Sequence, residues 1–278
     1  MKVTVLIENE AINNLECEHG LSFLIDYKGE RYLLDAGSSG AFLQNAKRMG
    51  FFLADVHKCI LSHGHYDHSG GFVSLFKENA ESVLYMMERA VDEYYSASGG
   101  MHYIGIPKEL KENYKERFVC INQVTRLSEG VYLVPHNTKG LEQIGERAKL
   151  YVRKERKEYP DDFSHELSLV FDSDEGLVVF NSCSHGGILN ILREVLEVFP
   201  GKKIQAFLGG LHMKGKVDGK EICTFSEKEI KSLAKGLKEI NVGCIYTGHC
   251  TGKIGIELLK KYGENLVQEL TTGKVIVL

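Results

Sequence analysis

The sequence predicts an α/β fold in which strands and helices alternate through two similar halves. Short apolar runs bounded by Gly, Asp or Asn indicate the strands, and apolar residues at helical spacing follow several of them. Histidines come directly after predicted strands at four places in the chain: 63–68, 185, 212 and 249. Because the strand ends of an open α/β sheet converge on its ligand crevice, we expect these histidines to belong to one functional site.

The first half opens as a strand meander and then leads into a histidine-rich loop. An apolar strand runs directly into His63-Gly-His-Tyr-Asp-His68, and Gly70-Gly71 follow before the next helix. The histidines are therefore expected in a strand-to-helix loop. The elements expected in this half are strands at 3–7, 21–26, 31–34 and 56–61 and helices at 42–49 and 72–76.

Residues 86–160 show only patchy periodicity, and we interpret them as a partly helical insertion in a single domain that spans 1–278. The basic residues between 147 and 157 are expected to form the solvated face of a helix.

The second half repeats the pattern of the first. A hairpin is expected at its start, because two apolar runs flank the turn Asp172-Ser-Asp-Glu-Gly176. Ser226 and Glu229 form a capping box that opens a helix. The elements expected here are strands at 167–171, 177–180, 203–208, 242–246 and 274–278 and helices at 188–196 and 226–240.

Composition excludes several classes of partner. The formal charge of −4 gives no basic field, so nucleic-acid binding is disfavoured. No run of about 18 apolar residues could span a membrane, and the N-terminus is too acidic for a signal peptide. Seven cysteines without a Cys-x-x-Cys pair indicate buried thiols in a reducing compartment. The protein is therefore expected in the cytoplasm.

Four potential metal ligands fall within six positions: His63, His65, Asp67 and His68. Imidazole and carboxylate suit zinc, iron or manganese. In an extended loop the first two side chains point the same way, and the last two can turn toward a neighbouring position. One metal needs three protein ligands plus water, so the further strand-end histidines imply a second ion.

The segment His-x-His-x-Asp-His after an apolar strand, with Asp35-Ala-Gly37 ahead of it, resembles the metallo-β-lactamase superfamily over essentially the whole chain. The resemblance implies a four-layer αβ/βα sandwich. Four motifs are similar to the branch named for dihydropterin ribofuranosyl-aminobenzene phosphate synthase. They are His63–Gly71, Ser182–His185, Gly209–His212 and Gly248–Gly252.

The superfamily pattern, carried over residue by residue, implies two divalent ions. It assigns His63, His65 and His185 to the first ion and Asp67, His68 and His249 to the second. Zinc is the first expectation, and manganese and iron are the alternatives. His165 competes with His185 for the first ion, and we favour His185 because its Ser-Cys-Ser-His-Gly-Gly setting matches the narrower branch.

One position departs from the superfamily pattern. Most members carry a bridging aspartate at the end of the strand that here reads Val178-Val-Phe-Asn-Ser-Cys183. Cys183, Asp161, Asp162 or solvent alone could take its place.

Asp67 and His212 are the expected catalytic residues. His212 lies outside the six-ligand set and could hydrogen-bond the substrate oxygen or donate a proton to the leaving group. For His19, His57, His102 and His136 we expect surface or core roles.

These features predict a metal-dependent hydrolase that uses a metal-bound hydroxide on a phosphoester or similar small polar ester. Its partner would be a small-molecule substrate, phosphorylated or not. A pterin-linked condensation is the first alternative. The second is a non-catalytic redox or metal-binding protein, suggested by Cys183 and Cys250 beside the expected ligands.

Overall fold

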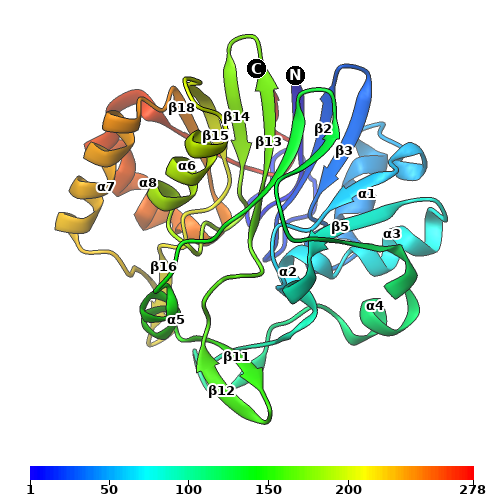
Figure 1. Cartoon of the computed structure of the whole chain (residues 1–278), viewed down its shortest axis with the longest axis horizontal. Coiled ribbons are helices and arrows are strands. Elements are labelled where there is room, and N and C mark those ends of the chain that lie inside the picture. The colour runs from blue at the N-terminus through cyan, green and yellow to red at the C-terminus, as the bar shows by residue number, and fades with distance from the viewer. The chain divides into compact units, whose positions relative to one another are not determined.

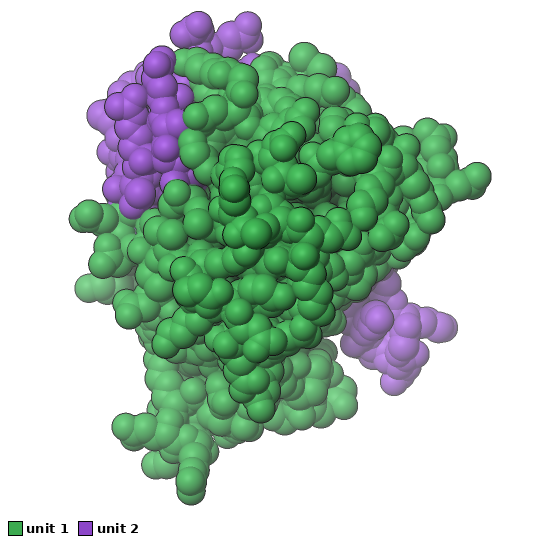
Figure 2. Space-filling model, turned by 90° about the vertical axis from the view of Figure 1, so that its right-hand side faces the viewer, with its two compact units in different colours: residues 1–123, 137–167, 271–278 green, residues 124–136, 168–270 purple.

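The computed structural model describes residues 1–278, and the contacts within the chain divide it into two compact units. Unit 1 comprises residues 1–123, 137–167 and 271–278 (green in Figure 2), and unit 2 comprises residues 124–136 and 168–270 (purple). Each unit is therefore assembled from separate stretches of sequence. A single domain with an insertion at 86–160 stays a prediction.

Unit 1 is built on a seven-stranded sheet with the order β20-β1-β2-β3-β4-β5-β8. The first hairpins are antiparallel, as the meander predicted, and β3, β4, β5 and β8 run parallel. The strands of this sheet are β1 (Lys2–Ile7), β2 (Ser22–Tyr27), β3 (Glu30–Leu34), β4 (Lys58–Ile60), β5 (Val83–Met87), β8 (Phe118–Ile121) and β20 (Val275–Val277).

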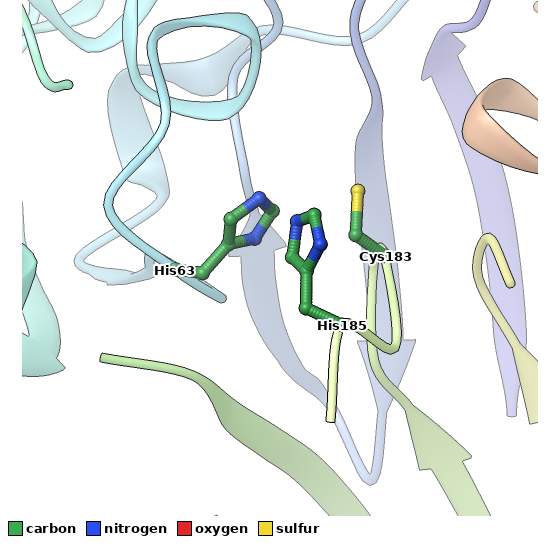
Figure 3. A group of neighbouring side chains, drawn as sticks. All are labelled: His63, Cys183 and His185. Atoms are coloured by element: carbon green, nitrogen blue, oxygen red, sulfur yellow. The ribbon is translucent and has the colours of Figure 1, made fainter. Parts of the chain in front are cut away.

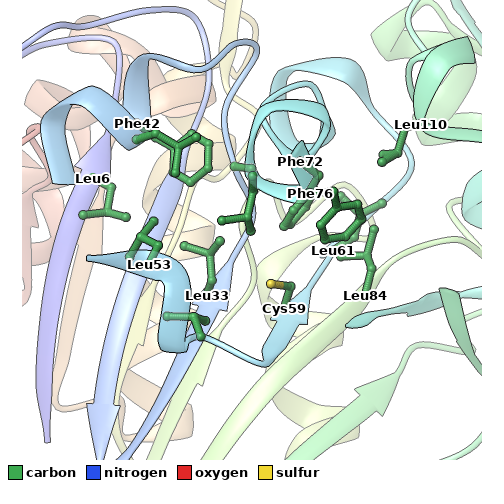
Figure 4. Packing of buried hydrophobic residues seen from close by; sticks show 14 of the residues in the cluster. Leu6, Leu33, Phe42, Leu53, Cys59, Leu61, Phe72, Phe76, Leu84 and Leu110 are labelled. Carbon is green, nitrogen blue, oxygen red and sulfur yellow. The ribbon is translucent and has the colours of Figure 1, made fainter. Parts of the chain in front are cut away.

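Helices pack against this sheet through a continuous apolar cluster. Phe42 of α1 and Phe72 of α3 belong to the same buried cluster as Leu33 and Leu84 of the sheet (Figure 4), so the predicted helical faces at 42–49 and 72–76 are confirmed. The helices of unit 1 are α1 (Ala41–Arg48), η1 (Leu53–Asp55), α2 (Tyr66–Ser69), α3 (Phe72–Glu78), η2 (Glu88–Val91), α4 (Lys108–Asn113), η3 (Lys115–Arg117) and α5 (Glu142–Ala148).

Unit 1 also contains a four-stranded sheet with the order β12-β11-β6-β7. The basic residues between 147 and 157 lie mainly on its β11–β12 hairpin, so the expected helix face is wrong for them. In β11 the buried Leu150 and Val152 alternate with the more exposed Tyr151 and Arg153, which is strand periodicity. The strands are β6 (Glu93–Ser96), β7 (His102–Tyr103), β11 (Leu150–Lys154) and β12 (Lys157–Pro160).

Unit 2 is built on a second seven-stranded sheet, with the order β19-β18-β15-β14-β13-β10-β9. Figure 1 labels its strands β13, β14, β15 and β18. The predicted hairpin is confirmed as the antiparallel pair β13–β14, and β14, β15, β18 and β19 run parallel. The strands are β9 (Thr125–Ser128), β10 (Val131–Pro135), β13 (Leu167–Ser173), β14 (Gly176–Phe180), β15 (Ile204–Leu208), β18 (Cys244–Thr247) and β19 (Val267–Glu269), with a separate hairpin of β16 (Lys214–Val217) and β17 (Lys220–Cys223).

The helices of unit 2 pack on this sheet in one apolar cluster that includes the buried Ile188, Leu192 and Val195 of α6. The predicted capping box is confirmed, because the Ser226 hydroxyl accepts from the Glu229 N–H and the Glu229 carboxylate accepts from the Ser226 N–H. The helices are α6 (Ile188–Val198), α7 (Glu227–Ile240), η4 (His249–Thr251), α8 (Gly252–Gly263) and η5 (Glu264–Leu266). None of the helices in the chain has the length and apolar character that crossing a membrane requires.

Candidate metal centre

The loop after β4 carries the four predicted ligands of unit 1. β4 is buried and leads through Ser62 into His63, and His65 has extended backbone just before the single turn of α2 that holds Asp67 and His68. All four residues predicted as ligands are buried. The predicted strand-to-helix loop is therefore present.

Gly64 fits this loop because the backbone passes close to its neighbours. A Cβ atom at this position would lie 2.5 Å from the carbonyl oxygen of Ala90. That is closer than real Cβ contacts, so only glycine lets the loop take this path.

The imidazole rings of this loop lie close together. The ring centroid of His63 is 4.6 Å from that of His65 and 4.3 Å from that of His68. Burial, helped by the neighbouring His165, lowers the pKa of His65 to about 3. The ring is therefore neutral at physiological pH, and the neutral ring is the form that binds metals.

Asp35 fixes the tautomers of two of these rings. Its Oδ2 atom lies 2.8 Å from Nδ1 of His68 and accepts from the Ser62 hydroxyl at 2.7 Å. The Ser62 hydroxyl uses its only proton in that bond, so at 2.8 Å it accepts from Nδ1 of His63. Both rings then carry their proton on Nδ1 and present Nε2 as the ligand atom, as metal-binding histidines commonly do.

Asp67 has a neighbour that sequence reasoning missed. Its Oδ2 atom lies 3.3 Å from Nε2 of the half-exposed His19 and 3.6 Å from Nε2 of His68. His19 is 48 positions away in the sequence, and no local pattern indicated that it would approach the loop.

His165 lies beside the ligand loop, and both of its ring nitrogens already bind protein groups. The Gly64 N–H donates to its Nδ1 at 2.9 Å, and its Nε2 lies 3.0 Å from Oδ2 of Asp161. Burial raises the pKa of Asp161, but the interaction with His165 outweighs it and holds that pKa below its usual value. One atom each of His65, Asp161 and His165 lie within 4.8 Å of one another. These contacts suit a residue that positions the loop, and they argue against His165 as a ligand.

The two aspartates considered as bridging groups are also held by other residues. Asp161 accepts from the Phe163 N–H at 2.9 Å in addition to its contact with His165. Asp162 accepts from the hydroxyl and N–H of Ser164 and lies 3.3 Å from the Arg89 guanidinium.

In unit 2 the predicted histidines follow three neighbouring parallel strands. His185 follows β14, His212 follows β15 and His249 follows β18, and these strands are adjacent in the sheet. Cys183 and His185 come from the same buried loop and are drawn as sticks in Figure 3, which also draws His63 of unit 1. The predicted convergence at strand ends therefore holds within this unit.

The ring centroids of His185 and His212 are 4.3 Å apart. The backbone N–H of His212 donates to Sγ of Cys250 at 3.3 Å, whereas the buried Nδ1 atom of its ring has no hydrogen-bond partner. An unsatisfied buried nitrogen costs about 1–3 kcal/mol, so it indicates a site for a further ligand.

The loops after these three strands share an unusual backbone conformation. Ser184, His212 and His249 have φ angles of 52°, 46° and 50°, in the left-handed region that non-glycine residues rarely adopt. Strained backbone of this kind gathers at functional sites. The donor set of buried imidazoles and one carboxylate fits a zinc, manganese or iron ion.

The fold and these histidine loops define a class of protein. Residues 15–120, which include the ligand loop of unit 1, match the family model described as the metallo-beta-lactamase superfamily. The predicted metallo-β-lactamase fold is confirmed, and so is the prediction of an enzyme of this superfamily of metal-dependent hydrolases.

Three similar proteins are particularly informative. The structure of Tm1679, titled a metal-dependent hydrolase of the β-lactamase superfamily, matches with a TM-score of 0.82 and 28% identity, over 100% of this chain and 99% of that one. A Methanocaldococcus jannaschii protein is 27% identical over 99% of this chain and 96% of its own length, and it is named 7,8-dihydropterin-6-methyl-4-(β-D-ribofuranosyl)-aminobenzene-5'-phosphate synthase. Zinc-bound PqqB from Methylobacterium extorquens shares the fold, with a TM-score of 0.60 and 14% identity over 100% of both chains.

Proposed function

We propose that this protein hydrolyses a phosphoester or similar small polar ester at a dinuclear metal centre. The observation that carries the proposal is the loop of unit 1, in which Asp35 and Ser62 fix two buried imidazoles with Nε2 as the ligand atom. Metal ions bind imidazole nitrogens that are held in a fixed orientation by such neighbours.

The proposed ligands come from both halves of the sequence. His63, His65 and His185 bind the first ion, and Asp67, His68 and His249 bind the second. The ions are zinc, with manganese or iron as alternatives. Because Asp161 and Asp162 are held by other residues, Cys183 or solvent is the proposed bridging group.

When bound, such ions lower the pKa of a coordinated water and polarise the substrate oxygen. The protein contributes the remaining parts of the reaction. Asp67, the only carboxylate of the loop, accepts a proton from the attacking water. His212 uses its unpartnered Nδ1 atom to bind the substrate oxygen or to protonate the leaving group.

Elemental analysis together with an ester panel tests this function. We expect about two metal ions per chain and metal-dependent turnover of a phosphodiester or phosphomonoester. Asp67→Ala should lose metal and activity, whereas Asp55→Ala, which changes an exposed aspartate of the same unit, should retain both. A metal-loaded protein inert toward phosphoester, lactone and thioester substrates would contradict the proposal.

A pterin-linked condensation is the second candidate, favoured by the similarity to the M. jannaschii protein over 99% of this chain. Micromolar binding of a reduced pterin, with product formation and without ester turnover, would favour it over hydrolysis. An iron centre that changes oxidation state reversibly would instead favour the redox alternative. We also infer a cytoplasmic location from the composition.

A further inference from the structure

Unit 2 contains a buried polar network that the proposed function does not use. His136 follows β10, and its Nδ1 lies 2.7 Å from Oε2 of Glu194 on α6. Its Nε2 lies 2.8 Å from the hydroxyl of Ser168 on β13. The Asn181 amide, just after β14, donates to the same hydroxyl at 3.1 Å. Four elements of unit 2 are thus joined by one chain of hydrogen bonds.

The proton positions in this network follow from its chemistry. The Glu194 carboxylate can only accept, so Nδ1 of His136 carries the proton and Nε2 accepts. Ser168 then donates to Nε2 and receives the amide proton of Asn181. Every donor therefore points toward Glu194, and bonds aligned in this way strengthen one another.

The order serine, histidine, carboxylate matches that of a nucleophilic triad, but the setting does not. Ser168 is 0% exposed, and its hydroxyl accepts a hydrogen bond from Asn181. A nucleophile must reach its substrate. Ser168 therefore cannot act as a nucleophile, and the role of the network must lie in the residues that it positions.

The network ends on the loop that carries His185. The side-chain oxygen of Asn181 accepts from the Ser184 N–H at 2.8 Å, and Ser184 precedes His185. The backbone of Ser184 is left-handed, so this bond stabilises a conformation that the residue would otherwise avoid. Asn181 must donate to Ser168 and accept from Ser184, which an amide can do and a carboxylate cannot. This requirement accounts for an asparagine, and not an aspartate, at this strand end.

We propose that Glu194, His136 and Ser168 are positioning residues that act through Asn181 to set the orientation of His185 for metal binding. The proposal rests on the proposed function in so far as His185 is a metal ligand. Residues that orient metal ligands typically change metal affinity by about 10- to 100-fold.

The test uses two variants in the full chain, Glu194→Gln and Ser168→Ala, which break the network at different bonds with little change in size. Glu197→Gln is the matched control, because Glu197 is an exposed glutamate on the same helix. The first measurement is hydrogen exchange of the Ser184 amide in metal-free protein. The second is zinc affinity by competition with a chromogenic chelator.

Both variants should exchange the Ser184 amide at least tenfold faster than the wild type and bind one zinc ion about tenfold more weakly. Glu197→Gln should match the wild type in both measurements. Unchanged exchange or unchanged zinc affinity in Ser168→Ala, the smaller substitution, would overturn the proposal. A wild-type protein without zinc affinity would refute the metal centre instead, and the exchange rates would then decide alone whether the network positions the loop.

Discussion

The Oδ2 atom of Asp35 lies 2.8 Å from Nδ1 of His68, and neither side chain is exposed to solvent. Asp35 precedes the ligand loop by almost thirty positions, yet it determines which nitrogen of His68 faces the proposed second ion.

Asp35→Asn should weaken metal binding. The amide carries no charge, and it cannot accept from the Ser62 hydroxyl, the Ser62 N–H and His68 in the same way. We expect a loss of about 10- to 100-fold in affinity for one ion, measured by chelator competition. Asp55→Asn is the control, and equal affinities for the two variants would show that Asp35 does not orient a ligand.

His212→Asn should reduce turnover without removing metal. Asparagine tolerates the left-handed backbone at this position, so the loop should keep its path. Loss of a positioned acid or hydrogen-bond donor should lower kcat by about 10²–10⁴-fold. Turnover and metal content should be measured on the same preparation, and an unchanged kcat would assign His212 a structural role.

His165→Ala and His185→Ala should have different effects on metal stoichiometry. His165 uses both ring nitrogens in contacts with Gly64 and Asp161, so its loss should loosen the loop and leave two ions bound at saturating metal. His185→Ala should lose one ion. Elemental analysis after dialysis gives the number of metal ions per chain in each variant. Loss of one ion in His165→Ala, with two retained in His185→Ala, would make His165 the ligand.

Removal of metal should destabilise the protein. An ion that binds only the folded chain stabilises it by about 2.7 kcal/mol when its concentration is 100 times its Kd. A chelator should therefore lower the Tm of the wild type by several degrees, and it should lower the Tm of Asp67→Ala much less. Equal shifts in the two proteins would mean that the chelator acts elsewhere.

Cys59 should make the stability of unit 1 sensitive to alkaline pH. Burial raises the pKa of this thiol from 9.0 to about 12, so the folded state favours its neutral form. The protonated Cys59 thiol therefore makes its full contribution to the free energy of unfolding below pH 9. This contribution is lost as the pH rises from 9 toward 12. At pH 10 the loss is about 1.4 kcal/mol.

Urea unfolding at pH 8 and pH 10 measures this effect. The free energy of unfolding should fall further between these pH values for the wild type than for Cys59→Val, by about the same 1.4 kcal/mol. Identical pH dependence in the two proteins would mean that the thiolate is tolerated in the core.

Local patterns predicted the parts of the site that are themselves local. His63, His65, Asp67 and His68 could be found because a strand, a glycine and a helix turn follow one another within a few residues. The partners of these residues could not be found in the same way. Gly64 and His165 are 101 positions apart, and His136 and Glu194 are 58 apart, so only the folded chain brings each pair together.

One missed element did have a local signal. The β16–β17 hairpin turns at Asp218 and Gly219, both with positive φ, and Asp-Gly is a preferred pair for such turns. The basic hairpin β11–β12 was misjudged for another reason. Its charges obscured a two-residue alternation of buried and exposed side chains.

The left-handed backbone at Ser184, His212 and His249 also limits how far substitutions can raise thermal stability without a loss of metal binding. The left-handed backbone at each of these residues lowers the free energy of unfolding by about 1–2 kcal/mol, a cost that glycine would not have. A screen for heat resistance would therefore favour glycine at these positions. The same glycines would make the backbone of the histidine loops more flexible. In metal-free protein, glycine at each of these three positions should therefore raise the Tm, whereas metal retention should fall, so selection for heat resistance without metal would erode metal binding.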